Sequence, residues 1–152
     1  MRRTVVCLLL VAPSVVAAPA PLPKADRYSD RDRVRGKWEV YSEVFGVCLN
    51  IKENTAVFPL TVARESHVAT FTGDRLLWRV RGEVVGEDAV RLDRGRIDLT
   101  DVRSGQTRRG RYKVEGDTLT ICVSPAGEAD RPASFSPERA LERVYVLRRR
   151  RK

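Results

Sequence analysis

The chain lacks the residue patterns on which most nucleophilic catalysis and zinc binding depend. Its 152 residues include a single histidine, His67, and no nucleophile motif such as G-x-S-x-G accompanies it. The three cysteines, Cys7, Cys48 and Cys122, do not have the short spacings that are typical of zinc sites. We therefore expect the protein to have no metal, no cofactor and no catalytic residue.

Long apolar segments are also scarce. The extended apolar run at residues 4–16 follows Arg2 and Arg3 and precedes the small residues Ala17 and Ala18. It is too short for a stable membrane anchor and has the layout of a secretory signal peptide. We expect residues 1–17 to be removed by cleavage after Ala17, and the mature protein to be secreted or periplasmic.

Positive charge exceeds negative charge, but little of the excess belongs to the central part of the chain. There are 29 lysines and arginines against 20 acidic residues, a net charge of +9. Two basic residues would leave with the signal peptide, and five form the terminal run Arg148, Arg149, Arg150, Arg151 and Lys152. A nucleic-acid reader needs a basic face on its folded body, so we expect no specific nucleic-acid partner. We expect the terminal run, whose last residues 150–152 form a basic tail, to bind polyanionic envelope components instead.

The rest of the chain reads as short strands. Residues 18–33 are polar with alternating charges, which predicts a flexible linker. Strict alternation then begins, with Trp38, Val40 and Val44 on one face and Glu39, Tyr41 and Glu43 on the other, as in a half-buried strand. Seven further strands are predicted at residues 68–72, 76–80, 83–92, 96–102, 107–115, 118–123 and 143–149, with a bulge at Gly86.

The spacing of these strands predicts the fold class. No helical pattern of 10–15 residues separates them, which excludes a parallel sheet. Eight antiparallel strands joined by tight turns favour an all-β protein with an up-and-down barrel over residues 34–149, and a β-sandwich is the alternative. Two connections remain less regular: residues 60–66 are expected to form a short helix or a rim loop, and residues 137–142, after an N-cap at Ser136, one helical turn.

Several motifs resemble those of a known family. The GDTL segment from Gly116 with the cysteine at 122, and the RP-x-x-F segment at residues 131–135, resemble the pattern of an uncharacterised planctomycete family of secreted lipocalin-like β domains. The segment IDLT at residues 97–100 resembles a further part of that pattern, and Gly36-Lys37-Trp38 matches the G-x-W that opens the first strand of lipocalins. The resemblance covers roughly residues 34–149 and implies a lipocalin-like barrel in an exported protein, without implying an activity. Separately, we expect the protein to be a monomer.

The resemblance also implies structural roles. In lipocalins the first-strand tryptophan closes the base of the barrel beneath a basic side chain from the last strand, so Trp38 is expected to pair with Arg148 or Arg149. We assign structural roles to Gly36, Trp38, Gly116, Asp117 and Pro132. The candidate ligand contacts are Trp78, Tyr112, Arg131 and Phe135. For the last two the structural alternative is that Arg131 bonds carbonyl groups and Phe135 plugs one end of the barrel.

Two functions remain open at this point. One is a barrel that binds a small apolar or amphipathic molecule, and the other is a cell-envelope interaction module with a filled core that acts through loops and the basic tail. A paired-carboxylate hydrolase built on Asp98 and Asp101 has nothing in its favour. Cys48 and Cys122 are expected to be free thiols, with the Cys122 side chain pointing outward; a disulfide would require the segment after the first strand to fold over the eighth.

Overall fold

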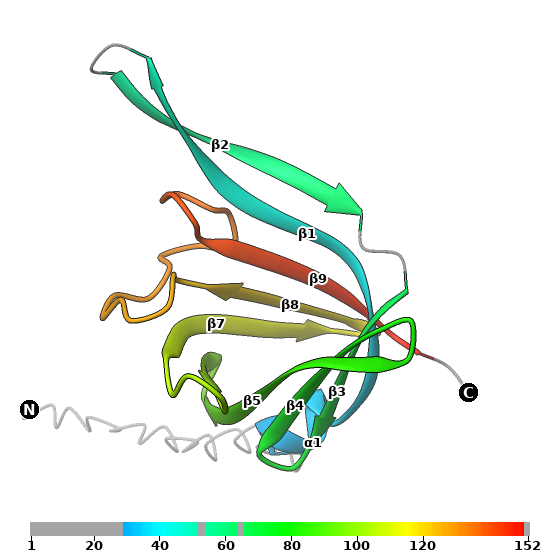
Figure 1. Cartoon of the computed structure of the whole chain (residues 1–152). Helices are drawn as coiled ribbons and strands as arrows, with labels where there is room; N and C mark the ends of the chain where they lie inside the picture. The colour runs from blue at the N-terminus through cyan, green and yellow to red at the C-terminus, as the bar shows by residue number, and fades with distance from the viewer. Residues whose placement is uncertain (1–28, 52–53, 64–65, 151–152) are drawn as a thin grey trace, which may run out of the picture.

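The computed structural model describes residues 29–51, 54–63 and 66–150. Within them, one short helix precedes a run of antiparallel strands (Figure 1). The elements are α1 (Asp30–Val34), β1 (Gly36–Ile51), β2 (Asn54–Ala63), β3 (His67–Thr72), β4 (Arg75–Val80), β5 (Glu83–Asp93), β6 (Arg96–Asp101), β7 (Thr107–Glu115), β8 (Thr118–Val123) and β9 (Arg143–Arg149).

Eight of these strands close into an up-and-down barrel. β3 to β8 each pair with the next strand along the chain, and β1 pairs with β3 at one edge and with β9 at the other. Closure is made by residues 38–45 of β1, which pair with residues 143–149 of β9. The predicted fold is therefore confirmed, and the closed ring of strands excludes the sandwich.

β2 was not predicted, and the expectation of a short helix or rim loop at residues 60–66 is wrong for residues 60–63. β1 continues past the barrel to Ile51, and β2 pairs with residues 42–51 of β1. Pro59, which suggested a break, lies opposite Gly46 in a strand whose other edge is unpaired, where the missing N–H is not needed. The β1–β2 hairpin projects beyond the other strands at the upper left of Figure 1.

The end of the predicted linker is ordered. Residues 30–33 belong to α1, and the Ser29 hydroxyl accepts a bond from the Asp32 N–H while the Asp32 carboxylate accepts from the Ser29 N–H. This capping box stabilises the helix start and was overlooked because the charges around it suggested a flexible segment. The predicted signal peptide, residues 18–28 and the last two residues of the basic tail lie outside the described residues.

The helical turn predicted at residues 137–142 is wrong. This part of the chain is irregular, and the buried Glu142 carboxylate accepts hydrogen bonds from the backbone N–H groups of Glu138 and Arg139 and from the Arg139 side chain. Because the side chain of Glu142 satisfies these donors, the segment needs no helix and no N-cap at Ser136.

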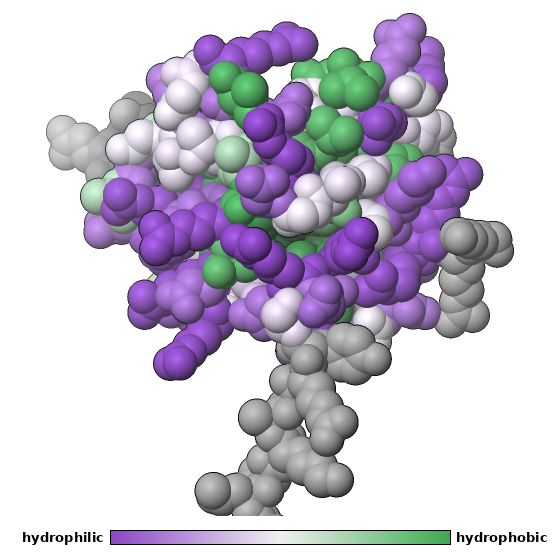
Figure 2. Space-filling model, turned by 90° about the horizontal axis from the view of Figure 1, so that it is seen from below, coloured by the Kyte–Doolittle hydropathy of each residue, from purple (hydrophilic) through white to green (hydrophobic). Residues whose placement is uncertain are grey.

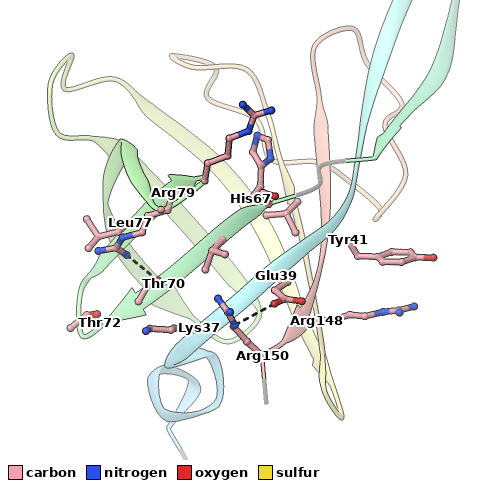
Figure 3. A pocket seen from close by; sticks show the side chains of 15 residues that line it. Lys37, Glu39, Tyr41, His67, Thr70, Thr72, Leu77, Arg79, Arg148 and Arg150 are labelled. Carbon is pink, nitrogen blue, oxygen red and sulfur yellow. Dashed lines mark hydrogen bonds and ion pairs between the residues drawn. The ribbon is translucent and has the colours of Figure 1, made fainter. Parts of the chain in front are cut away.

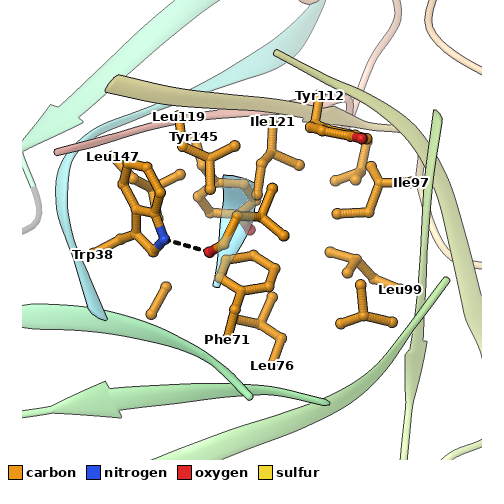
Figure 4. Packing of buried hydrophobic residues seen from close by; sticks show 14 of the residues in the cluster. Trp38, Phe71, Leu76, Ile97, Leu99, Tyr112, Leu119, Ile121, Tyr145 and Leu147 are labelled. Carbon is orange, nitrogen blue, oxygen red and sulfur yellow. Dashed lines mark hydrogen bonds between the residues drawn. The ribbon is translucent and has the colours of Figure 1, made fainter. Parts of the chain in front are cut away.

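The barrel interior is filled along most of its length. Its apolar side chains come from β1 and from β3 to β9 (Figure 4), and Val34 of α1 belongs to the same cluster. Trp38, Leu76, Leu99, Leu119 and Leu147 have no exposed surface. Hydrophilic side chains cover most of the outside in the view of Figure 2, with hydrophobic side chains in patches between them. The period-two pattern predicted from the sequence therefore sorts most strand residues correctly.

The connection between β8 and β9, residues 124–142, covers the outer face of β8. Arg109 and Arg111 of β7 donate to the carbonyls of Ala129 and Ala133 in this connection. Beneath it, Cys122 has no exposed surface although it alternates with the inward residues of β8. Cys122 points outward as predicted, but the connection buries it as a free thiol.

Candidate functional site

One end of the barrel is closed and the other is open. The closed end, the base, carries α1 and Trp38. The Trp38 Nε1 donates to the Val34 carbonyl at 2.7 Å, and the Arg149 guanidinium carbon lies 4.2 Å from the centre of the Trp38 ring. Arg149 in turn donates to the carbonyls of Arg33 and Arg35. The predicted base closure, including the cation–π partner from the last strand, is confirmed.

The opposite end holds a cleft of about 310 Å³, which we call the mouth pocket. It lies where β3 begins and β4 ends, at the strand ends far from α1. Its walls combine apolar, aromatic and charged side chains, namely Val40, Glu43, His67, Trp78, Val80, Val85, Glu87, Asp88, Asp101, Arg108, Arg143 and Tyr145, with Gly86 beside them. The mouth pocket therefore places charged side chains at the open end of a barrel whose interior is mostly apolar.

Asp88 is the most deeply buried charge of the mouth pocket, with 2% of its surface exposed. Its Oδ2 accepts from Trp78 Nε1 at 2.7 Å and from Arg108 Nη2 at 2.9 Å, and the same Arg108 nitrogen lies 3.0 Å from Oδ1. A buried carboxylate needs such partners, because an unpaired charge in this position would strongly destabilise the fold. The three side chains fix one another in a single arrangement.

A second buried carboxylate, Glu43, lies in the same pocket. Its Oε1 is 3.3 Å from Arg143 Nη1, and Arg143 is half exposed whereas Glu43 is buried. Burial and the nearby Glu43 charge raise the pKa of Tyr145, and a hydrogen bond with Tyr145 raises the pKa of Arg143. The Tyr145 ring lies 5.1 Å from the Trp78 ring, centre to centre, at an interplanar angle of 43°.

No protein-family model, curated protein or solved structure matches the chain. The strand topology supports the lipocalin-like eight-stranded barrel that the sequence resemblance implies. The activity and the ligand must therefore be argued from the site itself.

The four candidate ligand contacts are not brought together. Trp78 lines the mouth pocket. Tyr112 is buried towards the base, where its N–H donates to the Gly95 carbonyl. Burial of the Tyr112 side chain is the main cause that raises its pKa, and the negative charge of Asp30 in α1 adds to it. Arg131 and Phe135 lie in the β8–β9 connection, outside the barrel, so neither shares a pocket with Trp78.

Arg131 fastens the connection to the barrel wall. Its Nη1 donates to the carbonyls of Ile97 and Gly110 on the paired strands β6 and β7, and its Nη2 lies 2.7 Å from the Asp98 carboxylate. Pro132 beside it is fully buried. Phe135 is half buried, with the Lys113 ammonium 5.4 Å from its ring centre, and is outside the interior cluster. These contacts favour the structural alternative for Arg131, whereas Phe135 does not plug an end of the barrel.

Gly36, Gly116 and Asp117, to which the sequence analysis assigned structural roles, lie at the base of the barrel. Gly36 and Gly116 both have positive φ angles, 123° and 58°, which favour glycine. The Asp117 carbonyl accepts from the Arg149 N–H, which ties the β7–β8 turn to the end of β9.

The sequence analysis missed the charged residues of the mouth pocket. Glu43 was placed on the outer face with Glu39, but the pairing of β1 with β9 shifts by one residue between Val40 and Ser42, which turns Glu43 inward. Asp88 and Arg108 each stand in phase with inward apolar residues of their strands, Val90 and Tyr112. A charged residue at a position that the alternation assigns to the barrel interior was the signal that could have revealed these pocket residues.

The described part of the chain contains no group of three or more histidine, cysteine or acidic side chains that could hold a metal ion. No helix in that part is long and apolar enough to cross a membrane. Of the two carboxylates considered for hydrolysis, Asp98 pairs with Arg131, and Asp101 accepts from the N–H groups of Arg103 and Ser104, which lowers the pKa of Asp101. Both carboxylates therefore already have structural partners.

Proposed function

We propose that the protein is a lipocalin-like barrel that binds one small amphipathic molecule in its mouth pocket. The observation that carries this proposal is the lining of that pocket, in which the Trp78–Tyr145 ring pair lies beside two buried carboxylates held by arginines. An eight-stranded barrel is either filled by its own side chains or holds one small ligand. Here the base is filled, and the mouth supplies the remaining space.

The chemistry of the pocket favours an amphipathic ligand over a purely apolar one. A wholly apolar molecule would remove water from the half-exposed Arg143 without replacing the hydrogen bonds of its guanidinium group to that water, which is unfavourable. A compact ring could instead lie against Trp78 and Tyr145 while a polar substituent meets Arg143 or Glu43. A volume of about 310 Å³ is at the lower end of ligand pockets and suits a compact molecule rather than a long acyl chain.

The proposal is tested by binding measurements with two small probes of opposite charge, phenylacetate and phenethylamine, followed through tryptophan fluorescence. Val85 and Val84 are adjacent in β5 and both about half exposed, but only Val85 lines the pocket. We expect Val85→Phe to weaken binding of the preferred probe by about tenfold, because the larger ring occupies the cleft. Val84→Phe is the matched control and should leave binding unchanged.

Native mass spectrometry of the protein purified from its own host would complement the probes by detecting a retained small molecule. Absence of any retained mass, together with no response to either probe, would reject the proposal. Equal weakening by the two valine variants would place binding outside the mouth pocket.

We further propose that the protein acts after export and by binding rather than by catalysis. The N-terminal signal-peptide pattern supports export. The structural partners of Asp98 and Asp101 argue against the one hydrolytic pair that the sequence offered. Fractionation of the host cells tests the location, and protein retained in the cytoplasm with Met1 intact would contradict it.

A further inference from the structure

A wide hollow lies outside the barrel, on the face formed by β1, β3, β4 and β9. This outer groove has a volume of about 990 Å³. Five of its lining side chains are basic, Lys37, Arg79, Arg81, Arg148 and Arg150, and one is acidic, Glu39. Figure 3 shows labelled members of this set on neighbouring strands around the hollow. From the sequence, the excess positive charge was expected in the terminal run. The fold brings further basic residues, from β1 and from the β4–β5 turn, next to that run.

Most of this charge is available to a partner. Lys37 and Arg81 are exposed, and neither forms a salt bridge within the described part of the chain. Arg79 donates to the Thr70 hydroxyl, and Arg148 lies 3.8 Å from the centre of the Tyr41 ring, so neither is neutralised by a carboxylate. Glu39 offsets only Arg150, whose Nε lies 3.4 Å from its Oε1. A hollow with one sign of charge concentrates anions of the opposite sign.

We infer that the outer groove binds an acidic polysaccharide, a linear sugar chain that carries sulfate or carboxylate groups. The cations would contact the acidic groups, while the hydroxyls of Ser66, Thr70 and Thr72 in the groove can hydrogen-bond to neutral sugar hydroxyls. A single-stranded nucleic acid would need free aromatic platforms, whereas Tyr41 of the groove already has Arg148 over one face of its ring. This inference is independent of the ligand proposed for the mouth pocket.

The first test measures affinity of the whole mature protein for heparin and dextran sulfate at several salt concentrations, with neutral dextran as the uncharged reference. We expect Lys37→Gln combined with Arg81→Gln to weaken binding by about tenfold, because two exposed ionic contacts are lost. Arg91→Gln combined with Arg103→Gln removes the same charge from exposed positions outside the groove and should change affinity less than twofold. All four positions are exposed, so the thermal midpoint should stay unchanged.

A second test relies on a gain that damage to the fold cannot produce. Glu39→Gln removes the one acidic side chain of the groove and frees Arg150, so affinity should rise by about threefold. The control is Glu115→Gln, which removes an exposed acid paired with Lys113 away from the groove. It should leave affinity within twofold of the parent.

Duplex DNA and vesicles of anionic lipid serve as competing partners for the same variants. Equal weakening by the groove and control pairs would overturn the inference, because binding would then follow net charge alone. Tighter, groove-dependent binding of DNA or vesicles would overturn the assignment to a polysaccharide. Groove-dependent binding of dextran sulfate with no binding of neutral dextran is the expected result.

Discussion

At the base of the barrel, Trp38 contacts both the first and the last element of the described chain, α1 and β9. It is fully buried, its Nε1 donates to Val34 of α1, and Arg149 of β9 stacks on its ring. We predict that Trp38→Ala lowers the free energy of unfolding by about 3–5 kcal/mol, because a large cavity and an unpaired carbonyl remain. Urea denaturation measures this change.

Trp38→Phe is the informative control for that prediction. It keeps much of the ring volume but removes the hydrogen bond to Val34, so a loss of about 1–2 kcal/mol is expected. A denaturation midpoint of Trp38→Ala close to that of the parent would show that α1 and Arg149 do not depend on the indole.

Cys122 provides a prediction about reactivity and pH. Burial, aided by the charge of Glu142, raises the pKa of its thiol to about 12. The folded protein therefore disfavours the thiolate, so the contribution of this thiol to stability is fully present below the pKa of the unfolded cysteine. It is lost progressively as the pH rises from about 8.5 towards 12.

The measurement is thiol titration with a disulfide reagent at pH 8. Native protein should leave Cys122 unreacted, because the reactive thiolate is both suppressed and covered. Denatured, unreduced mature protein should show two thiols, from Cys48 and Cys122. A Cys122→Ser variant identifies its share, and no reactive thiol in the denatured protein would reveal a disulfide and contradict the prediction.

At the level of single residues, alternation along a strand predicted most inward side chains but failed at Glu43. The reason is the register shift in β1, since one extra residue exchanges the two faces of every residue that follows. The sequence around Tyr41 carries no glycine to mark this shift, in contrast to Gly86, where the predicted bulge in β5 is present. Polar residues of the mouth pocket were therefore partly hidden from sequence analysis.

At the level of elements, the tight turns made the strands from residue 67 onwards predictable, whereas the β1–β2 hairpin was not. β2 pairs with residues 42–51 of β1 and, in the described part of the chain, with no second strand, so it lies at the edge of the sheet outside the closed barrel. The β8–β9 connection is held by arginine bonds to backbone carbonyls, which depend on tertiary placement and leave no periodic signal. The connection is therefore defined by contacts between residues that are distant in sequence.

The close approach of β7 and β8 at Gly110 yields a prediction at this scale. A Cβ atom on Gly110 would collide with the Cys122 carbonyl and lie 2.7 Å from Val123 Cγ1. We expect Gly110→Ala to lower the free energy of unfolding by about 1–3 kcal/mol, because the two strands would have to separate and the bond from Arg131 to the Gly110 carbonyl would be strained.

Gly86→Ala is the matched control in another strand. A Cβ atom there would meet Trp78 Cδ1 at 3.5 Å, an ordinary van der Waals distance. The two variants are compared by thermal denaturation, and Gly86→Ala should be the milder. Equal midpoints would mean that β8 can shift without cost, which would contradict the close packing inferred here.

At the scale of the whole molecule, the mouth pocket and the outer groove share a wall. Val40 and His67 line both hollows, and β1, β3 and β4 contribute to each. The fold class was predictable because it depends on strand count and spacing. The two hollows were not, because each assembles side chains from strands that are separated in sequence by up to about a hundred residues, as the Arg143–Glu43 pair illustrates.

The last prediction concerns where the functional domain begins. Cleavage after Ala17 would leave α1 intact, since its capping box starts at Ser29. We therefore expect mass spectrometry of the exported protein to find a mature N-terminus at or next to Ala18, and the chain from residue 18 to unfold at the same midpoint as one that starts at residue 29.

A chain that starts at Gly36 would lack the Val34 carbonyl that pairs with Trp38 and the carbonyls that hold Arg149. Its free energy of unfolding should fall by about 2–4 kcal/mol, because a buried side chain and several hydrogen bonds are lost together. Equal stability of the three chains would show that the base of the barrel closes without α1.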